Sequence, residues 1–550
     1  MTRVYYRGPI DFCNYSCSYC PFAKKKYSKE KLRSEKRSLD RLHRQLQTME
    51  QVELMFTPYG EALCHSICQE ALIRFARMDS VKGIGIQTNL SLDIEKLLFL
   101  GEQTNGKLKL WATYHPEFAA SDEFAAKANR LSEQIDLSVG MVADGKNLDQ
   151  IRSMRSRLSP SIYLWINAMD RRKYRFDREM IERHRSIDPM FGFEFYHGRS
   201  DAKNGFEHCN SSEALYIDGI RYSSDCFFKK AKAIGRDCHD HRCCDCYLGY
   251  SNFFHSKPAA FFGSGLMFRV PQKRRYEAAF IDVDGVLLDE RGHRTAGVEE
   301  ALILLQSKAK LYLATARSYR SAKKALGSLM RYFSGGVFSD GALVRDFDRK
   351  WEKRSILNEI QLRKVLASIS VDGDGSQRTR KAPSIPEDEI SDPNRYKQED
   401  PSDGPLADRE RRSQKILWED RIEGELLRVR VPIPIAKKIQ TLHDALGEEG
   451  RAEVDPDTRP VRDPILDLNI RRYGRKCYIR SRGSSKKNGI RLLMENYHLK
   501  PDEVLFISDD LQDEEVFSYL PYTVSPLAIE EVAHLSHYQL DLKHLGFIIR

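Results

Sequence analysis

Over the first 200 residues, short apolar, β-prone runs alternate with charged, amphipathic stretches, and this alternation permits few folds. Parallel strands need a crossover connection, usually a helix, so strands that alternate with helices favour βα units around a parallel sheet. The sequence therefore predicts an α/β fold, with a partial (β/α) barrel in residues 1–200. The apolar runs are Glu53–Thr57, Gly83–Asn89, Leu108–His115, Asp136–Ala143, Ile162–Ala168 and Phe191–His197.

The length of 550 residues, at about 150 residues per domain, implies more than one hydrophobic core. Residues 372–414 contain no Phe, Trp or Val, so we expect this insertion to be disordered, because it cannot bury enough apolar area to offset its ordering entropy. The predicted units are the barrel at 1–200, a Cys-rich metal-binding extension at 201–258, a linker at 259–275, a second, Rossmann-like α/β core at 276–345 and 471–550, and an α+β cap at 346–470.

The composition excludes several classes of protein. Hydrophobic residues make up 41% and charged residues 31% of the chain, which suits packed, soluble cores. No apolar run approaches the roughly 20 residues of a membrane span, and the N-terminus lacks a signal peptide, so we expect a cytoplasmic protein without a membrane partner. The net charge of +10 is spread along the chain and does not indicate nucleic-acid binding.

Most of the twelve cysteines are clustered, and in a cytoplasmic chain such clusters indicate metal ligands before disulfides. Cys13, Cys17 and Cys20 form a CxxxCxxC motif just after the strand-like Val4–Tyr6. Three thiolates so spaced can hold three corners of a cubane iron–sulfur cluster and leave the fourth iron open. The alternative, a zinc site, would need a fourth ligand.

This motif resembles the radical S-adenosylmethionine (SAM) superfamily. The resemblance covers about residues 1–250 and implies an oxygen-sensitive [4Fe-4S] cluster, bound SAM, an electron donor and a 5'-deoxyadenosyl radical that abstracts hydrogen from the substrate. Tyr19 matches the aromatic residue that lies against the adenine. Gly60 and Glu61 resemble the family's GGE motif, which receives the methionine amino group, with Tyr59 in place of the first glycine. Further stretches similar to one bacterial subgroup are Tyr6–Pro9, Cys20–Lys24, Tyr114–Glu117 and Trp165–Ala168.

Three polar residues at predicted strand ends are weaker candidates for the same site. Asn89, His115 and Asn167 either contact SAM or substrate, as in a βα barrel, or satisfy local backbone groups. Cys64 and Cys68, four residues apart on a predicted helix, are interpreted as small buried residues rather than ligands.

Residues 201–258 hold a second cysteine cluster. Tyr216–Cys226 reads as a hairpin that ends in a thiol, and the arrangement resembles the C-terminal extensions of radical SAM enzymes, which carry an auxiliary cluster. The preferred ligands are Cys209, Cys226, Cys243 and Cys246. A second iron–sulfur cluster, a Zn²⁺ ion assisted by His239 and His241, and no metal at all remain open alternatives.

A third site begins at Phe280–Leu287, a strand that runs into a DxDG loop. Two carboxylates at a strand end, Asp282 and Asp284, can share the work of phosphoryl transfer while Mg²⁺ offsets charge. Further along the chain, Thr315 ends a strand, Lys486 opens a helix, and the acidic residues Asp509 and Asp513 follow another strand. Thr315 and Lys486 are 171 residues apart.

The ordered motifs resemble the haloacid dehalogenase (HAD) superfamily. The resemblance implies that Asp282 is a nucleophile, Asp284 a general acid and base, and Thr315 and Lys486 ligands of the phosphoryl oxygens. Asp509 is then the chief Mg²⁺ ligand, with Asp282, Asp284 and Asp513 also assigned to the metal site. The long insertion before Lys486 is a cap of the second type.

The stretch from Ser508 to Phe517 is similar to trehalose-phosphate and related sugar-phosphate phosphatases, although Ser508 stands where they have glycine. This similarity favours small phosphorylated, sugar-like substrates. The predicted protein is thus a fusion of a radical SAM enzyme with a Mg²⁺-dependent HAD phosphatase. The alternative is a non-catalytic, zinc-stabilised binding protein with relic sites. The basic charge makes nucleic acid a candidate ligand in that case.

Overall fold

The structure is a computed structural model in which the chain forms two compact units. The first comprises Met1–Tyr276, Ala296–Lys308 and Tyr522–Arg550, and the second Glu277–Thr295 and Ala309–Pro521. No helix among the described residues is both long and apolar enough to cross a membrane. The structure describes residues 2–20, 26–169, 176–191, 214–219, 221–223, 260–263, 269–360, 362–363, 365–366, 417–422, 425–431, 434, 436–441, 468–473 and 476–550.

The first unit contains a sheet in the order β6-β5-β4-β3-β2-β1-β7-β8. Strands β1 to β7 pair in parallel, and β8 pairs with β7 in antiparallel fashion. The predicted α/β fold with a parallel sheet is confirmed. The strands are β1 (Thr2–Arg7), β2 (Val52–Phe56), β3 (Val81–Thr88), β4 (Leu108–Thr113), β5 (Asp136–Ala143), β6 (Tyr163–Ala168), β7 (Ala214–Asp218) and β8 (Arg221–Ser223).

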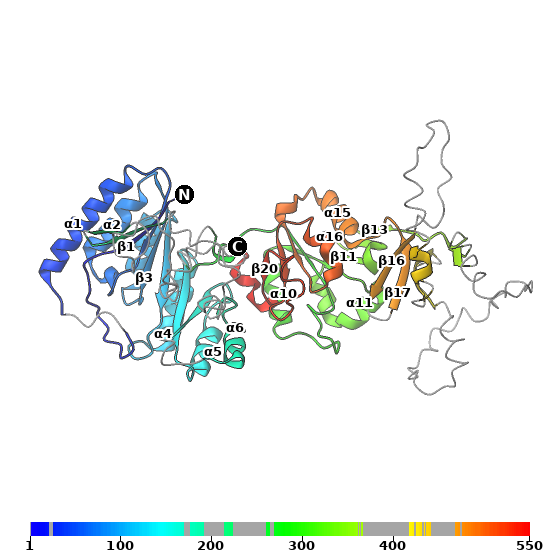
Figure 1. Ribbon diagram of the computed structural model, residues 1–550, viewed down its shortest axis with the longest axis horizontal. Helices are drawn as coiled ribbons and strands as arrows, with labels where there is room; N and C mark the ends of the chain where they lie inside the picture. The colour runs from blue at the N-terminus through cyan, green and yellow to red at the C-terminus, as the bar shows by residue number, and fades with distance from the viewer. Residues whose placement is uncertain are drawn as a thin grey trace, which may run out of the picture. The chain divides into compact units, whose positions relative to one another are not determined.

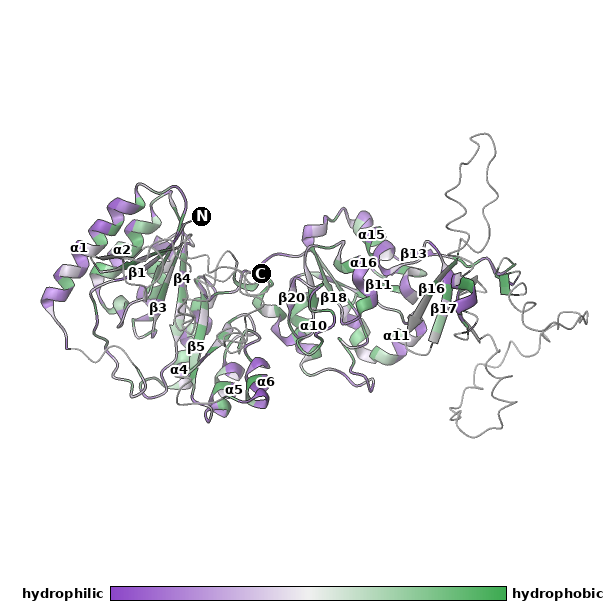
Figure 2. Cartoon of the chain, viewed as in Figure 1, coloured by the Kyte–Doolittle hydropathy of each residue, from purple (hydrophilic) through white to green (hydrophobic). Residues whose placement is uncertain are grey.

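Helices connect the successive strands β1 to β6, and each of α1 to α4 packs against the next helix along the chain. Their apolar residues join the strands in one core, whereas hydrophilic residues dominate the outer parts of α1 and α6 (Figure 2). The order of β1 to β6 is sequential, as in a βα barrel, but barrel closure remains a prediction. The helices are α1 (Lys29–Leu46), α2 (Ser66–Ala76), α3 (Ile94–Gln103), α4 (Ser121–Ser132), α5 (Leu148–Arg157) and α6 (Arg178–Arg185) (Figure 1).

The predicted hairpin after the barrel is present as β7 and β8, with Gly219 at a φ of 59° in the turn. Phe261, within the predicted linker, is buried against Tyr163 of β6. The end of the predicted run at Phe191–His197 lies outside the described residues. The first unit also includes α10 (Val298–Gln306), β19 (Thr523–Ser525), β20 (Tyr538–Gln539) and the 3-10 segment Leu542–Phe547.

The second unit contributes strands in the order β13-β12-β11-β10-β9-β18. Strand β9 is central and pairs in parallel with β10 on one side and β18 on the other. The two parallel neighbours of β9 thus lie on opposite sides of it, and in open α/β sheets the carboxyl ends of the strands at such a position bind ligands. The strands are β9 (Ala278–Ile281), β10 (Lys310–Ala314), β11 (Gly335–Phe338), β12 (Leu343–Asp346), β13 (Trp351–Arg354) and β18 (Val504–Ile507), and the helices are α11 (Tyr319–Leu326), α15 (Lys486–Tyr497) and α16 (Glu514–Phe517).

The predicted cap contains an antiparallel sheet in the order β14-β15-β17-β16. Its small apolar core includes Val429, Ile439 and Ile479. The sheet continues to Ser481, past the predicted cap boundary at residue 470. The insertion at 372–414 lies outside the described residues. The strands are β14 (Leu417–Ile422), β15 (Glu425–Val431), β16 (Leu468–Tyr473) and β17 (Lys476–Ser481).

Candidate active sites

The DxDG loop follows β9 and places Asp282 at the carboxyl end of the central strand. The Asp282 side chain is buried. Gly285, with a φ of 72°, packs so tightly on Asp509 that a Cβ atom there would lie 1.7 Å from the Asp509 Oδ2 atom. Glycine is required at this position because it tolerates positive φ and leaves room for the carboxylate. The loop thus brings the predicted nucleophile and the predicted metal ligand to one edge of the sheet.

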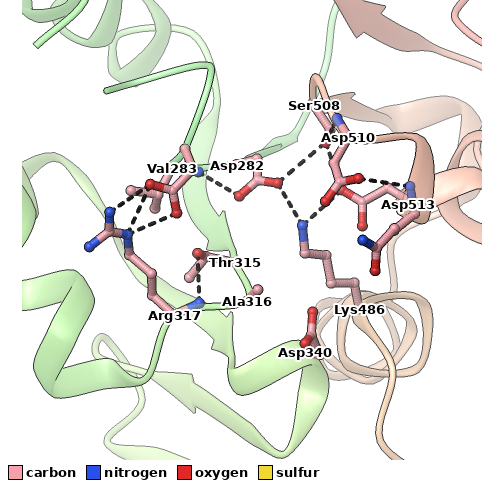
Figure 3. Close-up of polar contacts among 12 residues, drawn as sticks. Asp282, Val283, Thr315, Ala316, Arg317, Asp340, Lys486, Ser508, Asp510 and Asp513 are labelled. Carbon is pink, nitrogen blue, oxygen red and sulfur yellow. Dashed lines mark hydrogen bonds and ion pairs between the residues drawn. The ribbon is translucent and has the colours of Figure 1, made fainter. Parts of the chain in front are cut away.

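Lys486 joins two of the predicted aspartates (Figure 3). Its Nζ donates to Asp282 Oδ2 at 2.6 Å and to Asp513 Oδ2 at 2.8 Å, and all three side chains are buried. The Ser485 hydroxyl caps the helix by accepting from the Asn488 amide, which fixes the start of α15 as predicted. The Ser508 hydroxyl donates to the same Asp513 oxygen at 2.6 Å.

Burial dominates the electrostatics of these carboxyls. Desolvation raises the pKa of Asp282 and Asp513, and the Lys486 ammonium opposes the rise. Desolvation also raises the pKa of Asp509 to about 6. The charge on Asp509 in turn raises the pKa of Asp282. The site therefore concentrates negative charge that one lysine offsets only in part.

Thr315 ends β10 beside this cluster and is fully buried. Its amide donates to Val337 O, and its Oγ1 accepts from the Arg317 amide at 3.1 Å. The Arg317 guanidinium holds both carboxylate oxygens of Asp284, with Nη2 2.6 Å from Oδ1 and Nε 2.8 Å from Oδ2 (Figure 3). This hydrogen-bonded ion pair raises the pKa of Arg317. Asp284 thus faces Arg317, two residues after the threonine that the sequence predicts to bind phosphate.

Three further residues of this site were missed by the sequence reasoning. Asp340, in the turn after β11, is buried next to Arg428 and Arg480, which extend from the cap strands β15 and β17. In β15, Arg428 stands between the apolar Leu427 and Val429, a pattern typical of a half-buried strand with Arg428 on the solvated face, yet its side chain is only 4% exposed. The half-buried pattern is therefore wrong at this position, because the second face of the strand is covered as well. Apart from the neighbouring Gly341, no feature of the sequence predicted the left-handed conformation of Asp340 (φ 55°).

The donor set of this edge fits Mg²⁺. Magnesium prefers carboxylate oxygens and is usually held by one or two carboxylates together with substrate phosphate and water. Asp282 and Asp509 supply such oxygens at the DxDG loop. Within the described part of the chain, no group of three or more His, Cys, Asp and Glu side chains is placed to hold one metal ion.

The predicted cysteine motif lies in the loop after β1. Cys17 is buried and the other two thiols are partly buried. Burial, and then the neighbouring Cys20 and Cys13, raise the pKa of Cys17 to about 11. The three thiols are therefore neighbours, and their donor chemistry fits the three protein ligands of an iron–sulfur cluster, which bind three separate irons rather than one ion.

The loop after β4 contacts this cysteine loop. The Nδ1 atom of His115 lies 2.8 Å from the Tyr19 hydroxyl and 3.4 Å from Cys17 Sγ. The Glu117 carboxylate accepts from the Ser18 amide at 2.9 Å. Burial lowers the pKa of His115 to about 4, so its imidazole is neutral at neutral pH. His115 and Tyr19, both predicted from the sequence, are thus brought together with a thiol.

The GGE-like segment approaches the cysteines from β2. A Cβ atom on Gly60 would lie 1.9 Å from Phe12 O, directly before Cys13, so only glycine allows this close approach of two backbones. The Tyr59 ring packs under the Arg7 guanidinium, 4.6 Å from the ring centroid. Tyr59, which stands in place of glycine, is therefore accommodated by its contact with Arg7.

Glu61 and Asn89 connect this segment to β3. The buried Glu61 carboxylate accepts from the amides of Leu63 and Asn89 and from the Thr88 hydroxyl, at 3.1, 2.6 and 3.0 Å. Burial raises the pKa of Glu61 to about 7. The Asn89 side chain donates to Asn14 at 2.9 Å and lies 3.8 Å from Cys13 Sγ. Glu61 thus positions the loop on which Asn89 meets the cysteines.

Other predicted residues lie elsewhere. Asn167 is in the edge strand β6, with four strands between it and β1, and no hydrogen bond among the described residues joins it to the cysteine loop. Cys68 is buried on α2 as expected, but Cys64 is exposed and precedes the helix, because His65 forms its N-cap. The auxiliary ligands Cys209, Cys226, Cys243 and Cys246 lie outside the described residues.

Glu35 of α1 supports the start of the cysteine loop and was also missed. Its carboxylate accepts from the Tyr6 hydroxyl at 2.9 Å and from the Ile10 amide at 3.1 Å. A Cβ atom on Gly8 would lie 2.1 Å from it. Because Glu35 lies in an otherwise charged helix, the sequence offers no signal for its burial.

Comparison with known proteins gives one family match. The haloacid dehalogenase-like hydrolase family matches residues 279–371. No curated protein matches the chain. Similar solved structures include a HAD-superfamily phosphatase from Bacteroides thetaiotaomicron, with 18% identity, covering 50% of this chain and 96% of that chain at a TM-score of 0.33. Another is a HAD subclass IIB sugar phosphatase, with 15% identity, 49% and 95% coverage and a TM-score of 0.32.

A haloacid dehalogenase-like hydrolase from B. subtilis shows 13% identity, 49% and 96% coverage and a TM-score of 0.32. Likenesses at these TM-scores do not by themselves assign a fold or a function. The family match covers Asp282, Asp284 and Thr315. Residues 279–371 therefore belong to a haloacid dehalogenase-like hydrolase domain.

Proposed function

We propose that the second unit is a Mg²⁺-dependent phosphohydrolase for small phosphorylated, sugar-like substrates. The observation that carries the proposal is the buried Lys486 ammonium between Asp282 and Asp513 at the carboxyl ends of β9 and β18. A nucleophilic carboxylate, a cation and further acidic groups at one sheet edge are the parts that phosphoryl transfer needs.

In this proposal the Asp282 carboxylate attacks phosphorus, the bond to the leaving oxygen breaks, and Asp284 donates a proton to that oxygen. Water then attacks the phosphorus of the aspartyl-phosphate, Asp284 takes up the proton, and phosphate leaves as the Asp282 carboxylate is restored. Lys486 and Thr315 hold the phosphoryl oxygens. Bound Mg²⁺, held by Asp282 and Asp509, supplies further charge compensation.

Two contacts support the assignment of these roles. Arg317 holds both oxygens of Asp284 and so fixes the orientation of this side chain at the end of the DxDG loop. Asp513 holds the Lys486 ammonium in place from the side opposite to Asp282. Arg317 and Asp513 thus orient the reacting groups, whereas Asp282 and Asp284 carry out the bond-forming and proton-transfer steps.

The test is turnover of a panel of sugar phosphates and nucleotides by the full chain with Mg²⁺. The wild-type protein should release phosphate from at least one member, and Asp282→Asn should release none. If the wild-type protein and Asp282→Asn are equally inactive across the panel, the phosphatase proposal fails.

A second function is favoured by contacts of the first unit. We infer that Cys13, Cys17 and Cys20 bind a [4Fe-4S] cluster and that this unit cleaves SAM reductively to form a 5'-deoxyadenosyl radical. The support is the packing of Gly60 on the backbone before Cys13, together with Asn89 and His115 beside the thiols. Tyr19, Gly60, Glu61, Asn89, His115 and Asn167 are the proposed SAM or substrate residues.

Anaerobic reconstitution with iron and sulfide tests this function. The reduced protein should form 5'-deoxyadenosine from SAM, and Cys17→Ala should not. Equal amounts from both proteins would overturn the proposal. Iron that persists at about four per chain after loss of all three cysteines would support an auxiliary cluster at residues 209–246, whereas one zinc ion without iron would assign those cysteines a structural role.

The two proposals together describe a bifunctional enzyme. One unit modifies a small molecule by hydrogen abstraction, and the other removes phosphate from that molecule or from its precursor. An electron donor is the partner that reductive cleavage of SAM requires.

A further inference from the structure

Two buried arginines link the cap sheet to the phosphate-binding loop. Arg428 of β15 and Arg480 of β17 are direct cross-strand partners, so their side chains leave the same face of the sheet. Both are buried, with exposed fractions of 4% and 1%. Burial of two guanidinium groups on one face requires acceptors close at hand.

The acceptors come from two loops of the core. Arg428 Nη1 donates to Ala316 O at 2.8 Å, and Arg480 Nη1 donates to Asp340 O at 2.5 Å. The Asp340 Oδ2 atom lies 3.7 Å from an Nη1 atom of each arginine. The Tyr478 ring, 4.3 Å from the Arg428 guanidinium, supports its orientation. We call Arg428, Arg480 and Asp340 the cap clamp.

The cap clamp holds the backbone that carries the catalytic groups. Ala316 directly follows Thr315, whose carbonyl accepts from the Asp340 amide at 3.2 Å. Ser339 donates its amide to Arg317 O at 2.8 Å. A Cβ atom on Gly341 would lie 2.1 Å from Ser485 O, at the start of the helix that carries Lys486. One turn therefore contacts both phosphate-binding elements.

The conformation of this turn makes the clamp necessary. Ser339, Asp340 and Gly341 have φ values of 50°, 55° and 88°. Left-handed conformations at two consecutive non-glycine residues are strained and persist only where surrounding contacts enforce them. The two arginines supply such contacts from the cap.

We propose that Arg428, Arg480 and Asp340 are positioning residues, which set the geometry of Thr315 and Lys486 for phosphoryl transfer only when the cap is seated. The inference rests on the proposed phosphatase function and extends it. The cap clamp acts on the transferred phosphoryl group through the backbone and not through the leaving group, so its effect is the same for small and large substrates.

Amide hydrogen exchange of the full chain tests the clamp without relying on activity. In Arg480→Gln, Arg428→Gln and Asp340→Asn, peptides that cover residues 313–318 and 337–342 should exchange at least about tenfold faster. Peptides of β9 should be unchanged. Arg430→Gln, two positions further along the same face of β15 and outside the cap clamp, is the matched control and should leave both peptides unchanged. Unchanged exchange at 313–318 in folded Arg480→Gln and Asp340→Asn overturns the proposal.

Arg480→Lys keeps the charge and is the substitute variant if Arg480→Gln does not fold. It should give an intermediate increase in exchange, and no increase contradicts the clamp.

Kinetics give the second readout. For acetyl phosphate and for a sugar phosphate alike, kcat should fall about 10- to 100-fold while KM changes little. A rise in KM confined to the sugar phosphate would instead mean direct contact with the leaving group and overturn the positioning role. An inactive wild-type protein refutes the phosphatase function, while the exchange pattern still decides the clamp.

Discussion

The cysteine loop of the first unit and the aspartate site of the second unit are both built where parallel strands end, but different forces hold them. In the aspartate site, charged side chains hold each other, because the Lys486 ammonium lies between Asp282 and Asp513. In the cysteine loop, His115 contacts the Cys17 thiol, and the buried Glu35 carboxylate holds the backbone at Ile10, at the start of the loop.

This difference decides how each site responds to the loss of one member. Removing a charge from the aspartate site leaves another buried charge without compensation, which costs stability as well as activity. Removing a thiol leaves the loop anchored by Gly60 and Glu35. Variants of the aspartate site should therefore unfold more readily than variants of the cysteine loop.

The largest expected effect is on phosphatase turnover. Asp282→Asn removes the proposed nucleophile and should lower kcat by at least about a thousandfold. Glu290→Gln, an exposed residue of the following loop, is the control and should keep full activity. Phosphate release is the measurement; substantial turnover by Asp282→Asn would show that another group attacks phosphorus.

Cys17→Ala should abolish formation of 5'-deoxyadenosine while leaving the fold intact, because the contacts of Gly60 and Glu35 still anchor the loop. Cys68→Ala, which removes a buried thiol on α2, should keep both cluster and activity. The measurements are iron content, SAM cleavage and thermal unfolding. A large loss of stability in Cys17→Ala would remove the contrast between the two sites.

Lys486→Met should destabilise the second unit by about 3–5 kcal/mol, since two buried carboxylates lose their shared cation. Lys487→Met, the half-exposed neighbour on the same helix, should change stability by less than about 0.5 kcal/mol. Urea unfolding of the full chain measures both. A stability loss that is equal in the two variants would refute the role of Lys486 as the central ion.

Glu35 gives the first unit a pH dependence. Burial raises the pKa of Glu35 from 4.5 to about 7. The protonated carboxyl therefore stabilises the folded state fully below about pH 4.5, and this stabilisation, about 3 kcal/mol, is lost as pH rises through about 7. Glu35→Gln remains neutral and should remove this component. Urea unfolding at about pH 5 and about pH 8 measures it, and an identical pH dependence in the variant would contradict the assignment.

The smallest effect is expected for Ser508→Ala. This variant removes the hydroxyl that donates to Asp513 at 2.6 Å, and loss of one hydrogen bond to a charged group costs about 1.5–3 kcal/mol at most. Turnover should fall by less than about tenfold, since Lys486 still holds Asp513. Loss of all activity would mean that Ser508 takes part in the reaction directly.

Sequence motifs and hydrophobic periodicity predicted many of the strands, helices and site residues of both units. The strand Phe280–Ile281, the helix start at Ser485 and the order of β1 to β6 agree with the expected elements. Their position at strand ends predicted that Asn89 and His115 would lie near the cysteine loop, because parallel strands direct their carboxyl ends to one edge. Tyr19 was predicted from the family resemblance of the cysteine motif. The same rule also places Asn167 at this edge, although four strands lie between β6 and β1. The rule predicts which edge of the sheet a residue occupies, but not how many strands separate it from another residue at that edge.

By itself, the sequence determined the secondary structure and which acidic and thiol groups could react, because helix caps, strand runs and local spacing are set by neighbours in the chain. Only the tertiary structure decided which charges were buried. Arg428 appears solvated in the pattern of β15, and Glu35 in that of α1, yet both are covered by elements distant in sequence. Burial depends on what packs against a face, and that packing alone brings Asp340 between two cap arginines.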